Sequence, residues 1–267
     1  MSSASETDQL REEIFRLGPW HMDVEVTPEI STRISQDAPA GTYSEAFGPV
    51  GMPELRRPFV NRLRQLFPDG LDGRTVLDCA CNCGGYLFWA REQGAGDCLG
   101  FDVREHWIRQ AEFLRQNRRG PSDHIRFEVC DLYDVPALEL EPFDITIFNG
   151  IFYHLPDPIT GLKIAADLTS EVIIVGTATR SGLPDGLMAV GEESRENVMD
   201  GVHGLMWLPT GPEVLESILR WAGFADVHTT WWKRETRTPD WGRLEIIGAR
   251  SAGALDELRR RLPVSAI

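Results

Sequence analysis

The chain has 267 residues, of which 42% are hydrophobic and 25% are charged, a balance that suits one globular domain carrying a small annex. Its formal net charge is −14. Proteins that bind nucleic acid need a basic surface to meet the phosphate backbone, so this charge argues against a nucleic-acid partner. No segment approaches the roughly 20 apolar residues of a membrane-spanning helix, and we expect no membrane partner.

The cysteines and the N-terminal residues indicate the cellular setting. The number of cysteines is odd, three stand at alternate positions, and the polar N-terminus has no apolar signal segment. We therefore expect reduced thiols and a cytoplasmic location. The oligomeric state stays open, with a homodimer as one alternative. The five cysteines are Cys79, Cys81, Cys83, Cys98 and Cys130.

The first 69 residues are predicted to form an annex that covers the active site. Their pattern predicts a disordered tip, a short amphipathic helix, a short strand, an irregular loop and a second helix with a proline in its first turn. These segments are residues 1–9, 10–17, 20–26, 31–51 and 52–66, and the proline is Pro53. Two groups of arginines are interpreted as solvated helix faces. They are Arg56, Arg57, Arg62 and Arg64, and then Arg115, Arg118 and Arg119.

From residue 74 onward, short apolar runs alternate with segments of helical length, a pattern typical of βαβ units. Strands are predicted at residues 74–79, 98–103, 124–130, 143–149 and 171–177, and helices at 86–93, 106–117 and 159–168. A helix, two strands joined by a polar loop and a peripheral helix follow at 211–222, 225–232, 243–249 and 252–262. The predicted fold is α/β: a Rossmann-like, mostly parallel sheet with helices on both faces. It occupies residues 70–267, with residues 178–210 as a substrate-lining insertion.

The segment from residue 76 to 86, VLDCACNCGGY, follows a predicted strand and opens a predicted helix, as a nucleotide-type site requires. Small residues at alternate positions let the backbone approach a ligand, and the helix N-terminus supplies free N–H donors for a carboxylate. An aspartate at the strand end meets an ammonium group or organises the turn. The expected ligand contacts are Asp78, Cys79, Ala80, Asn82 and Gly84.

Other interpretations of this loop are weaker. The three cysteines form Cys-x-Cys-x-Cys, but zinc sites usually space cysteines more widely and need a fourth ligand, so we expect no metal. A nicotinamide dinucleotide enzyme requires Gly-x-Gly-x-x-Gly, which this loop does not offer. A tight strand–helix turn without a ligand is the remaining alternative. Asp102, which ends the second core strand 24 residues after Asp78, favours a ligand, because an acidic side chain there can accept both ribose hydroxyls.

Residues 76–86, 100–104 and 150–158 together resemble class I S-adenosylmethionine (SAM)-dependent methyltransferases. They are most similar to the branch that contains the tRNA uridine carboxymethyltransferases, and residues 206–210 and 222–224 also resemble that branch. The resemblance covers about residues 70–250. It implies SAM as the cofactor and a sheet of seven strands, one of them an antiparallel closing strand.

The class carries Asp-x-Gly-x-Gly-x-Gly in the cofactor loop. This chain keeps Asp78 and Gly84 but has Ala80 and Asn82 at the other two positions. Alanine is small, and asparagine tolerates left-handed backbone angles better than most residues, so we expect the loop to keep its shape.

The resemblance implies further cofactor contacts after the later strands. In the class, an acidic side chain after the third core strand contacts the adenine amino group beside an apolar wall. The end of the fourth core strand faces the reacting methyl group. The cofactor contacts expected beyond the loop are Asp102, Val103, Trp107, Asp131, Leu132 and Asn149.

The tRNA-modifying members of the branch use a carboxylated SAM that a lysine, a tyrosine and an arginine hold. Tyr153 and Arg243 stand where the last two are expected, but residues 41–53 contain no lysine. A buried carboxylate without a second cation would cost several kcal/mol. We therefore expect plain SAM as the cofactor.

Methyl transfer needs alignment of the nucleophile, the methyl group and the sulfur, and an O- or N-nucleophile also needs a base, most often histidine. His154, just after the fourth core strand, is the first candidate, and capping of the next turn is its alternative role. Tyr153 orients the acceptor or contacts the cofactor, and His21 of the annex is a second candidate base. Expected substrate contacts are Trp20, Glu192, His203, Trp207 and Arg243, with Trp231 and Trp232 as further walls of an aromatic pocket.

The sequence therefore predicts SAM-dependent methyl transfer to an oxygen or nitrogen atom of a small-molecule acceptor, with secondary metabolism as one setting. The first alternative is a tRNA-modifying (carboxy)methyltransferase. The second is a SAM-binding protein without catalysis, which Ala80 and Asn82 in the cofactor loop suggest.

Overall fold

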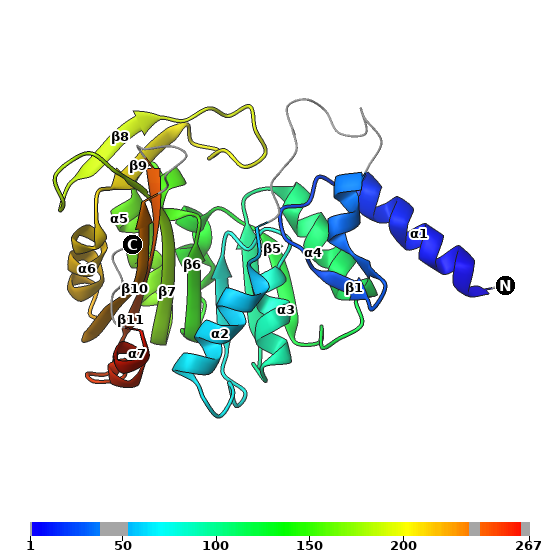
Figure 1. Ribbon diagram of the computed structural model, residues 1–267, viewed down its shortest axis with the longest axis horizontal. Coiled ribbons are helices and arrows are strands. Elements are labelled where there is room, and N and C mark those ends of the chain that lie inside the picture. Colours follow the sequence, from blue (N-terminus) through cyan, green and yellow to red (C-terminus); the bar gives the residue numbers. More distant parts are fainter. Residues whose placement is uncertain (1, 38–52, 235–240, 263–267) are drawn as a thin grey trace.

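A seven-stranded sheet organises the computed structural model, which describes residues 2–37, 53–234 and 241–262 (Figure 1). The strand order is β10-β11-β7-β6-β3-β4-β5. β11 runs antiparallel to both of its neighbours, and the other pairs are parallel, so the predicted fold class and closing strand are confirmed. The strands are β3 (Val76–Cys79), β4 (Cys98–Asp102), β5 (Ile125–Val129), β6 (Phe143–Asn149), β7 (Thr169–Arg180), β10 (Asp226–Arg234) and β11 (Trp241–Ala249).

Helices cover both faces of the sheet, which explains why its central strands are apolar almost throughout. One buried cluster joins a sheet face to α1 (Ser2–Leu17), α2 (Arg56–Leu66), α3 (Gly85–Glu92), α4 (Glu105–Asn117) and α7 (Asp256–Arg261). A second cluster joins the other face to α5 (Pro158–Asp167) and α6 (Pro212–Trp221). Within the described residues, no helix combines the length and the apolar character needed to cross a membrane.

The N-terminal annex differs from its prediction in several places. The helix α1 begins at Ser2, so the prediction of a disordered tip at residues 1–9 is wrong for residues 2–9. These polar residues extend a helix that packs against the core only from Leu10 onward. The strand predicted at 20–26 is only β1 (Glu25–Thr27), which pairs with β2 (Ile30–Ser31). The 3-10 helix η1 (Thr32–Asp37) follows, and the rest of the predicted loop lies outside the described residues. Pro53 precedes α2 instead of standing in its first turn.

The structure contains a hairpin that was not predicted. β8 (Met188–Glu192) and β9 (Leu205–Pro209) pair antiparallel inside the predicted insertion. Most of their side chains stay partly exposed, and Val190 is 58% exposed. The apolar run of β9, LMWLP, is too short for its pattern to distinguish a strand from a piece of helix. Two short 3-10 helices, η3 (Leu132–Leu138) and η4 (Phe152–His154), were also not predicted.

The two arginine groups are not simply solvated helix faces. Arg62 is 8% exposed, and its Nε lies 2.7 Å from Oε1 of Glu245 on β11. Arg118 is 9% exposed, and its Nη2 lies 2.6 Å from Oε1 of Glu92 on α3. The interpretation is wrong for these two side chains, which tie helices to the rest of the core, because a buried guanidinium is stable only when it is paired.

Asp226 fixes α7 against the sheet, and its charge predicts a pH-dependent stability. Its Oδ2 accepts a hydrogen bond from the Leu255 N–H at 2.9 Å, and its Oδ1 pairs with Arg259. Burial raises the pKa of Asp226, but the bonds from Leu255 and Arg259 outweigh it and hold the pKa below its usual value. Because the pKa of Asp226 is lower in the folded than in the unfolded protein, its charge stabilises the fold at any pH above the unfolded-state pKa. This stabilisation is lost as the pH falls through the folded-state pKa.

Asp226→Asn is therefore expected to lower the free energy of unfolding by about 1–3 kcal/mol at pH 7. The difference from the wild type should shrink as the pH falls through the lowered pKa of Asp226, where the native carboxylate also becomes protonated. Urea unfolding of both proteins at about pH 7 and in acid measures this. An equal loss at both would show that the charge of Asp226 does not contribute.

Candidate functional site

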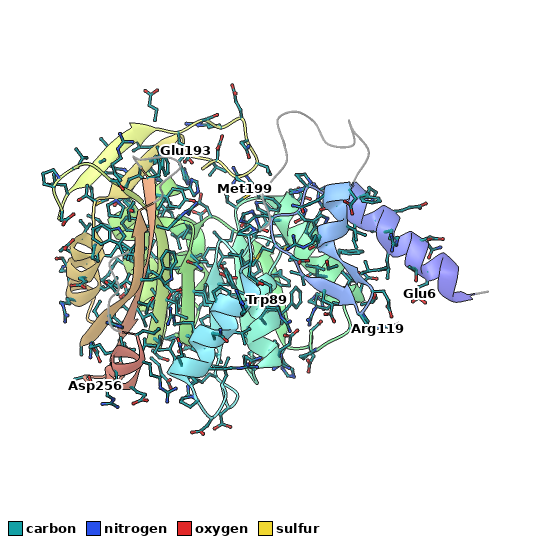
Figure 2. The ribbon with its side chains drawn as sticks, in the orientation of Figure 1. Glu6, Trp89, Arg119, Glu193, Met199 and Asp256 are labelled. Atoms are coloured by element: carbon teal, nitrogen blue, oxygen red, sulfur yellow. The ribbon has the colours of Figure 1, made fainter. Side chains whose placement is uncertain are left out.

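A cavity of about 800 Å³ opens at the carboxyl ends of the central parallel strands, where α/β sheets bind ligands. Its walls come from the loop after β3, the end of β4, the turn after β5 and the segment after β6. Residues 197–203 close another side, and they belong to the connecting loop, residues 193–204 between β8 and β9. Figure 2 marks Glu193 and Met199 in this part of the chain, above the end of the sheet.

The loop after β3 has left-handed backbone angles at all three positions where the class carries glycine. The φ angles are +60° at Ala80, +52° at Asn82 and +79° at Gly84, the N-cap of α3. The loop therefore keeps the expected shape without two of its glycines. Asn82 also stabilises the turn locally, because its Oδ1 accepts the Cys83 N–H at 2.8 Å. Ala80 and Asn82 line the cavity, whereas Gly84 lies behind it against the ring of Phe127.

Asp78 is buried at the end of β3 and is not among the residues that line the cavity. Its Oδ2 has no hydrogen-bond partner within the described residues. Burial, and then the nearby carboxylate of Asp102, raise the pKa of Asp78 well above its usual range. A cation placed near this carboxyl group would relieve both effects, so the position suits a ligand that carries an ammonium group.

Asp102 ends β4 and holds the backbone around it. Its Oδ2 accepts the Asn82 N–H at 3.1 Å, and its Oδ1 accepts the Arg104 N–H at 3.0 Å. Burial is the main cause that raises its pKa. Each carboxylate oxygen has a second lone pair, so the side chain keeps capacity for two hydroxyl donors. Asp102, Val103 and Trp107, three of the predicted cofactor contacts, all line the cavity.

The predicted adenine side is formed by Asp131 and Leu132, which line the cavity after β5. Asp131 caps η3, since its Oδ1 accepts the Tyr133 N–H at 3.0 Å. His203 reaches this side from the connecting loop, with its Nε2 at 3.5 Å from Oδ2 of Asp131. The structure thus places His203 beside the expected adenine contact, and not beside the expected acceptor.

The other end of the cavity gathers the predicted acceptor residues. Arg243 Nη1 donates to Oη of Tyr153 at 3.4 Å, and the rings of Tyr153 and His154 lie 3.9 Å apart between centroids. Asn149 Nδ2 donates to Oη of Tyr86 at 2.9 Å. All five side chains belong to cavity-lining residues, as do His21 of the annex and Trp231 of β10.

Several predicted contacts do not reach the cavity. Trp20 is 1% exposed, and its Nε1 donates to the Ile14 carbonyl at 2.8 Å, so it is a core residue whose N–H is satisfied inside the annex. Trp207 donates to the Pro156 carbonyl at 3.2 Å, and Trp232 packs in the apolar cluster under α5 and α6. Cys79 is buried in the same cluster, and Glu192 points to solvent from β8.

A further side chain at the candidate site, not predicted from the sequence, is Glu193. Its Oε1 lies 2.7 Å from Nδ1 of His154, with 11% of its side chain exposed and 18% of that of His154. Successive residues of an extended chain point to opposite sides, so Glu193 turns inward where Glu192 turns outward. The sequence signal was the pair of adjacent glutamates, and only the hairpin decides which of them meets His154.

The crowded cysteines behave as small apolar residues. Cys79, Cys81 and Cys83 are buried, and burial raises the pKa of each thiol, that of Cys83 to about 12. Thiols that stay protonated are poor metal ligands. Within the part of the chain that the structure describes, no three His, Cys, Asp or Glu side chains are grouped to hold a metal ion.

Thiol reactivity should follow burial. Cys130 is half-buried and lines the cavity, whereas the other four cysteines are buried. We expect Ellman's reagent to modify Cys130 in the native protein and all five thiols after unfolding. SAM at about ten times its dissociation constant should slow the native reaction roughly 10-fold, because free sites become that much rarer. Absorbance at neutral pH follows both reactions, and an unchanged rate with SAM would contradict ligand binding beside Cys130.

The chain is similar in sequence to known methyltransferases. A family model described as a methyltransferase domain matches residues 71–221. The tRNA U34 carboxymethyltransferase of Ectopseudomonas mendocina (strain ymp) is 29% identical over 189 residues, which cover 66% of this chain and 54% of the relative. The protein of the same name from Pseudomonas syringae pv. tomato is 31% identical, with 67% and 55% covered. The chain spans about half the length of these relatives.

Solved structures share the fold. The N-terminal domain of EvdMO1, crystallised with S-adenosylhomocysteine and D-fucose, has a TM-score of 0.68 at 18% identity, covering 91% of this chain and 96% of that one. A 1,6-didemethyltoxoflavin-N1-methyltransferase of Burkholderia thailandensis has a TM-score of 0.50 at 21% identity, with 73% and 78% covered. With the family match over more than half of its length, the chain belongs to the methyltransferase domain family of class I SAM-dependent methyltransferases.

Proposed function

We propose that this protein transfers the methyl group of SAM to an oxygen or nitrogen atom of a small-molecule acceptor. One observation carries the proposal: a single cavity is lined at one end by Asp102 and Asp131 and at the other by Tyr153, His154 and Arg243. Its volume of about 800 Å³ lies in the upper part of the range of small-molecule sites, which suits a cofactor together with a small acceptor.

The residues present fit SAM. Asp102 would accept the ribose hydroxyls, Asp131 the adenine amino group, and Leu132 would cover the adenine ring. The backbone at Ala80 and Asn82, open because of its left-handed angles, would lie against the amino-acid part of the ligand. SAM supplies an electrophilic methyl group on a sulfonium sulfur, so the protein has to align the acceptor, exclude water and accept a proton.

His154 is the proposed base, and Tyr153 the group that orients the acceptor beside it. His21 reaches the same cavity from the annex, which supports the role of residues 1–69 as a cover. The proposed insertion, residues 178–210, contributes the wall at 197–203. The net charge of −14 favours a small acceptor, as in secondary metabolism, over a nucleic acid. A cytoplasmic location is supported by five free cysteines, and a homodimer stays a prediction.

Isothermal titration with SAM tests the cofactor half of the proposal. Binding is expected in the micromolar range, and no heat at millimolar ligand would contradict it. Radiolabelled methyl transfer to a panel of small phenols, carboxylic acids and amines tests the other half. SAM binding without transfer to any member of the panel would favour the alternative of a SAM-binding protein without catalysis.

A second candidate is a tRNA-modifying carboxymethyltransferase. The contact between Arg243 and Tyr153 favours it, since these are two of the three groups that the resemblance implies for a carboxylated cofactor. Competitive titration of SAM against carboxylated SAM distinguishes the cofactors. A gel shift with bulk tRNA that weakens steeply with salt would support the tRNA substrate, because phosphate contacts release counterions.

A further inference from the structure

We propose that Glu193 is a positioning residue that fixes the His154 ring as a base with its Nε2 lone pair available to the acceptor. This inference rests on the proposed function, in which His154 receives the acceptor's proton. Glu193 follows β8 of the hairpin, whereas His154 lies in the turn after β6. The proposal therefore gives the hairpin a role in the reaction.

The contact between the two side chains is short and shielded. Nδ1 of His154 lies 2.7 Å from Oε1 and 2.8 Å from Oε2 of Glu193. Both side chains are largely buried, so little water competes for the bond and the charge of the carboxylate acts at reduced dielectric. A hydrogen bond of this kind to one ring nitrogen sets the proton arrangement of the whole imidazole.

Backbone geometry holds both partners in place. His154 ends η4, where its N–H donates to the Ile151 carbonyl at 2.9 Å. The N–H of Glu193 donates to the Gly204 carbonyl at 3.1 Å, which extends the hairpin to this residue. Gly201 lets the connecting loop approach, since a Cβ there would lie 3.0 Å from Cβ of His154. Backbone hydrogen bonds therefore fix both residues of the pair, which belong to two separate elements.

The chemical consequence follows from the tautomer. In the neutral ring, Nδ1 carries the hydrogen that it donates to the carboxylate, so Nε2 keeps a lone pair. As the acceptor atom bonds to the methyl carbon, the carbon–sulfur bond breaks and the sulfur keeps its electron pair. The acceptor's proton passes to Nε2, and the adjacent carboxylate stabilises the imidazolium that results.

Nitrogen-15 NMR of histidine-labelled protein tests the tautomer without any acceptor. At a pH where the ring is neutral, wild-type His154 should show a protonated Nδ1 and an unprotonated Nε2, with His154→Asn assigning the signals. Glu193→Leu removes the acceptor of the bond and is expected to shift the ring toward a mixture of tautomers. Glu192→Leu, at the exposed neighbouring position, should leave the spectrum unchanged. A wild-type ring protonated on Nε2, or an unaltered tautomer in Glu193→Leu, would overturn the proposal.

Kinetics with the best acceptor of the panel separates positioning from a purely structural contact. Glu193→Leu is expected to lower kcat about 10- to 100-fold, a part of the 10² to 10⁴ that a general base contributes, with the Kd of SAM within twofold of the wild type. Glu193→Gln, which keeps an oxygen acceptor but no charge, should recover part of the rate. Wild-type kcat in Glu193→Leu would refute the positioning role. Failure of the wild type itself to bind SAM would instead refute the proposed function, whatever the tautomer.

Discussion

Replacing Asp102 with alanine is expected to weaken SAM binding about 100-fold, the effect of losing two hydrogen bonds to a carboxylate at roughly 1.5 kcal/mol each. The loss has two sources. The proposed ribose hydroxyls lose their acceptors, and the Asn82 and Arg104 N–H groups lose the carboxylate that holds them at 3.1 and 3.0 Å. Isothermal titration gives the dissociation constant directly.

Asp97 offers a matched control for this variant. It lies just before the amino end of the same strand, its side chain is 79% exposed, and it is not among the cavity-lining residues. Asp97→Ala should bind SAM as the wild type does. Thermal unfolding of both variants shows whether the fold is intact. Binding by Asp102→Ala within threefold of the wild type would rule out Asp102 as a cofactor contact.

Gly84→Ala is expected to destabilise the fold by about 3 kcal/mol, because it combines backbone strain with a steric overlap in a packed core. The φ angle of +79° disfavours any side chain, and the new methyl group would overlap the ring of Phe127. Phe127 is half-buried and packs against Phe88 of α3 at 5.8 Å between ring centroids, so displacing its ring would disturb this contact.

Gly73→Ala separates the two causes. Gly73 has a φ of +75°, but a Cβ there would meet nothing within 4 Å. We expect this variant to lose only about 1 kcal/mol, the backbone part alone. Urea unfolding compares the two variants with the wild type. Equal losses would show that the contact with Phe127 does not matter.

The sheet was predictable because its strands are buried and therefore appear in the sequence as apolar runs. β7 is buried over most of its length, and the loop after β3 lies between two elements that the pattern identifies. The β8 and β9 hairpin was not predictable, since its strands are short and the apolar run of β9 does not distinguish a strand from a helix by periodicity. The start of α1 was missed because polarity in residues 2–9 does not prevent a helix that meets the core only from Leu10 onward.

The residues at one end of the cavity could be predicted from the sequence better than those at the other end. The proposed cofactor end depends on residues at or just after strand ends, and four of the predicted contacts, Ala80, Asn82, Asp102 and Asp131, line the cavity. Asp78, Cys79 and Gly84 of the same loop do not. The acceptor end depends on contacts across long stretches of chain. Glu193 meets His154 over 39 positions, and only the register of the hairpin turns this glutamate inward.

Arg104 gives the cavity a further property. Its N–H is held by Asp102, and its guanidinium donates to the carbonyl of Asp200 in the connecting loop. One residue thus joins Asp102, the proposed ribose contact, to the wall of the cavity. We therefore expect cofactor binding and the position of this loop to be coupled. By reciprocity, the bound cofactor favours the loop position that tightens its binding, and by the same factor.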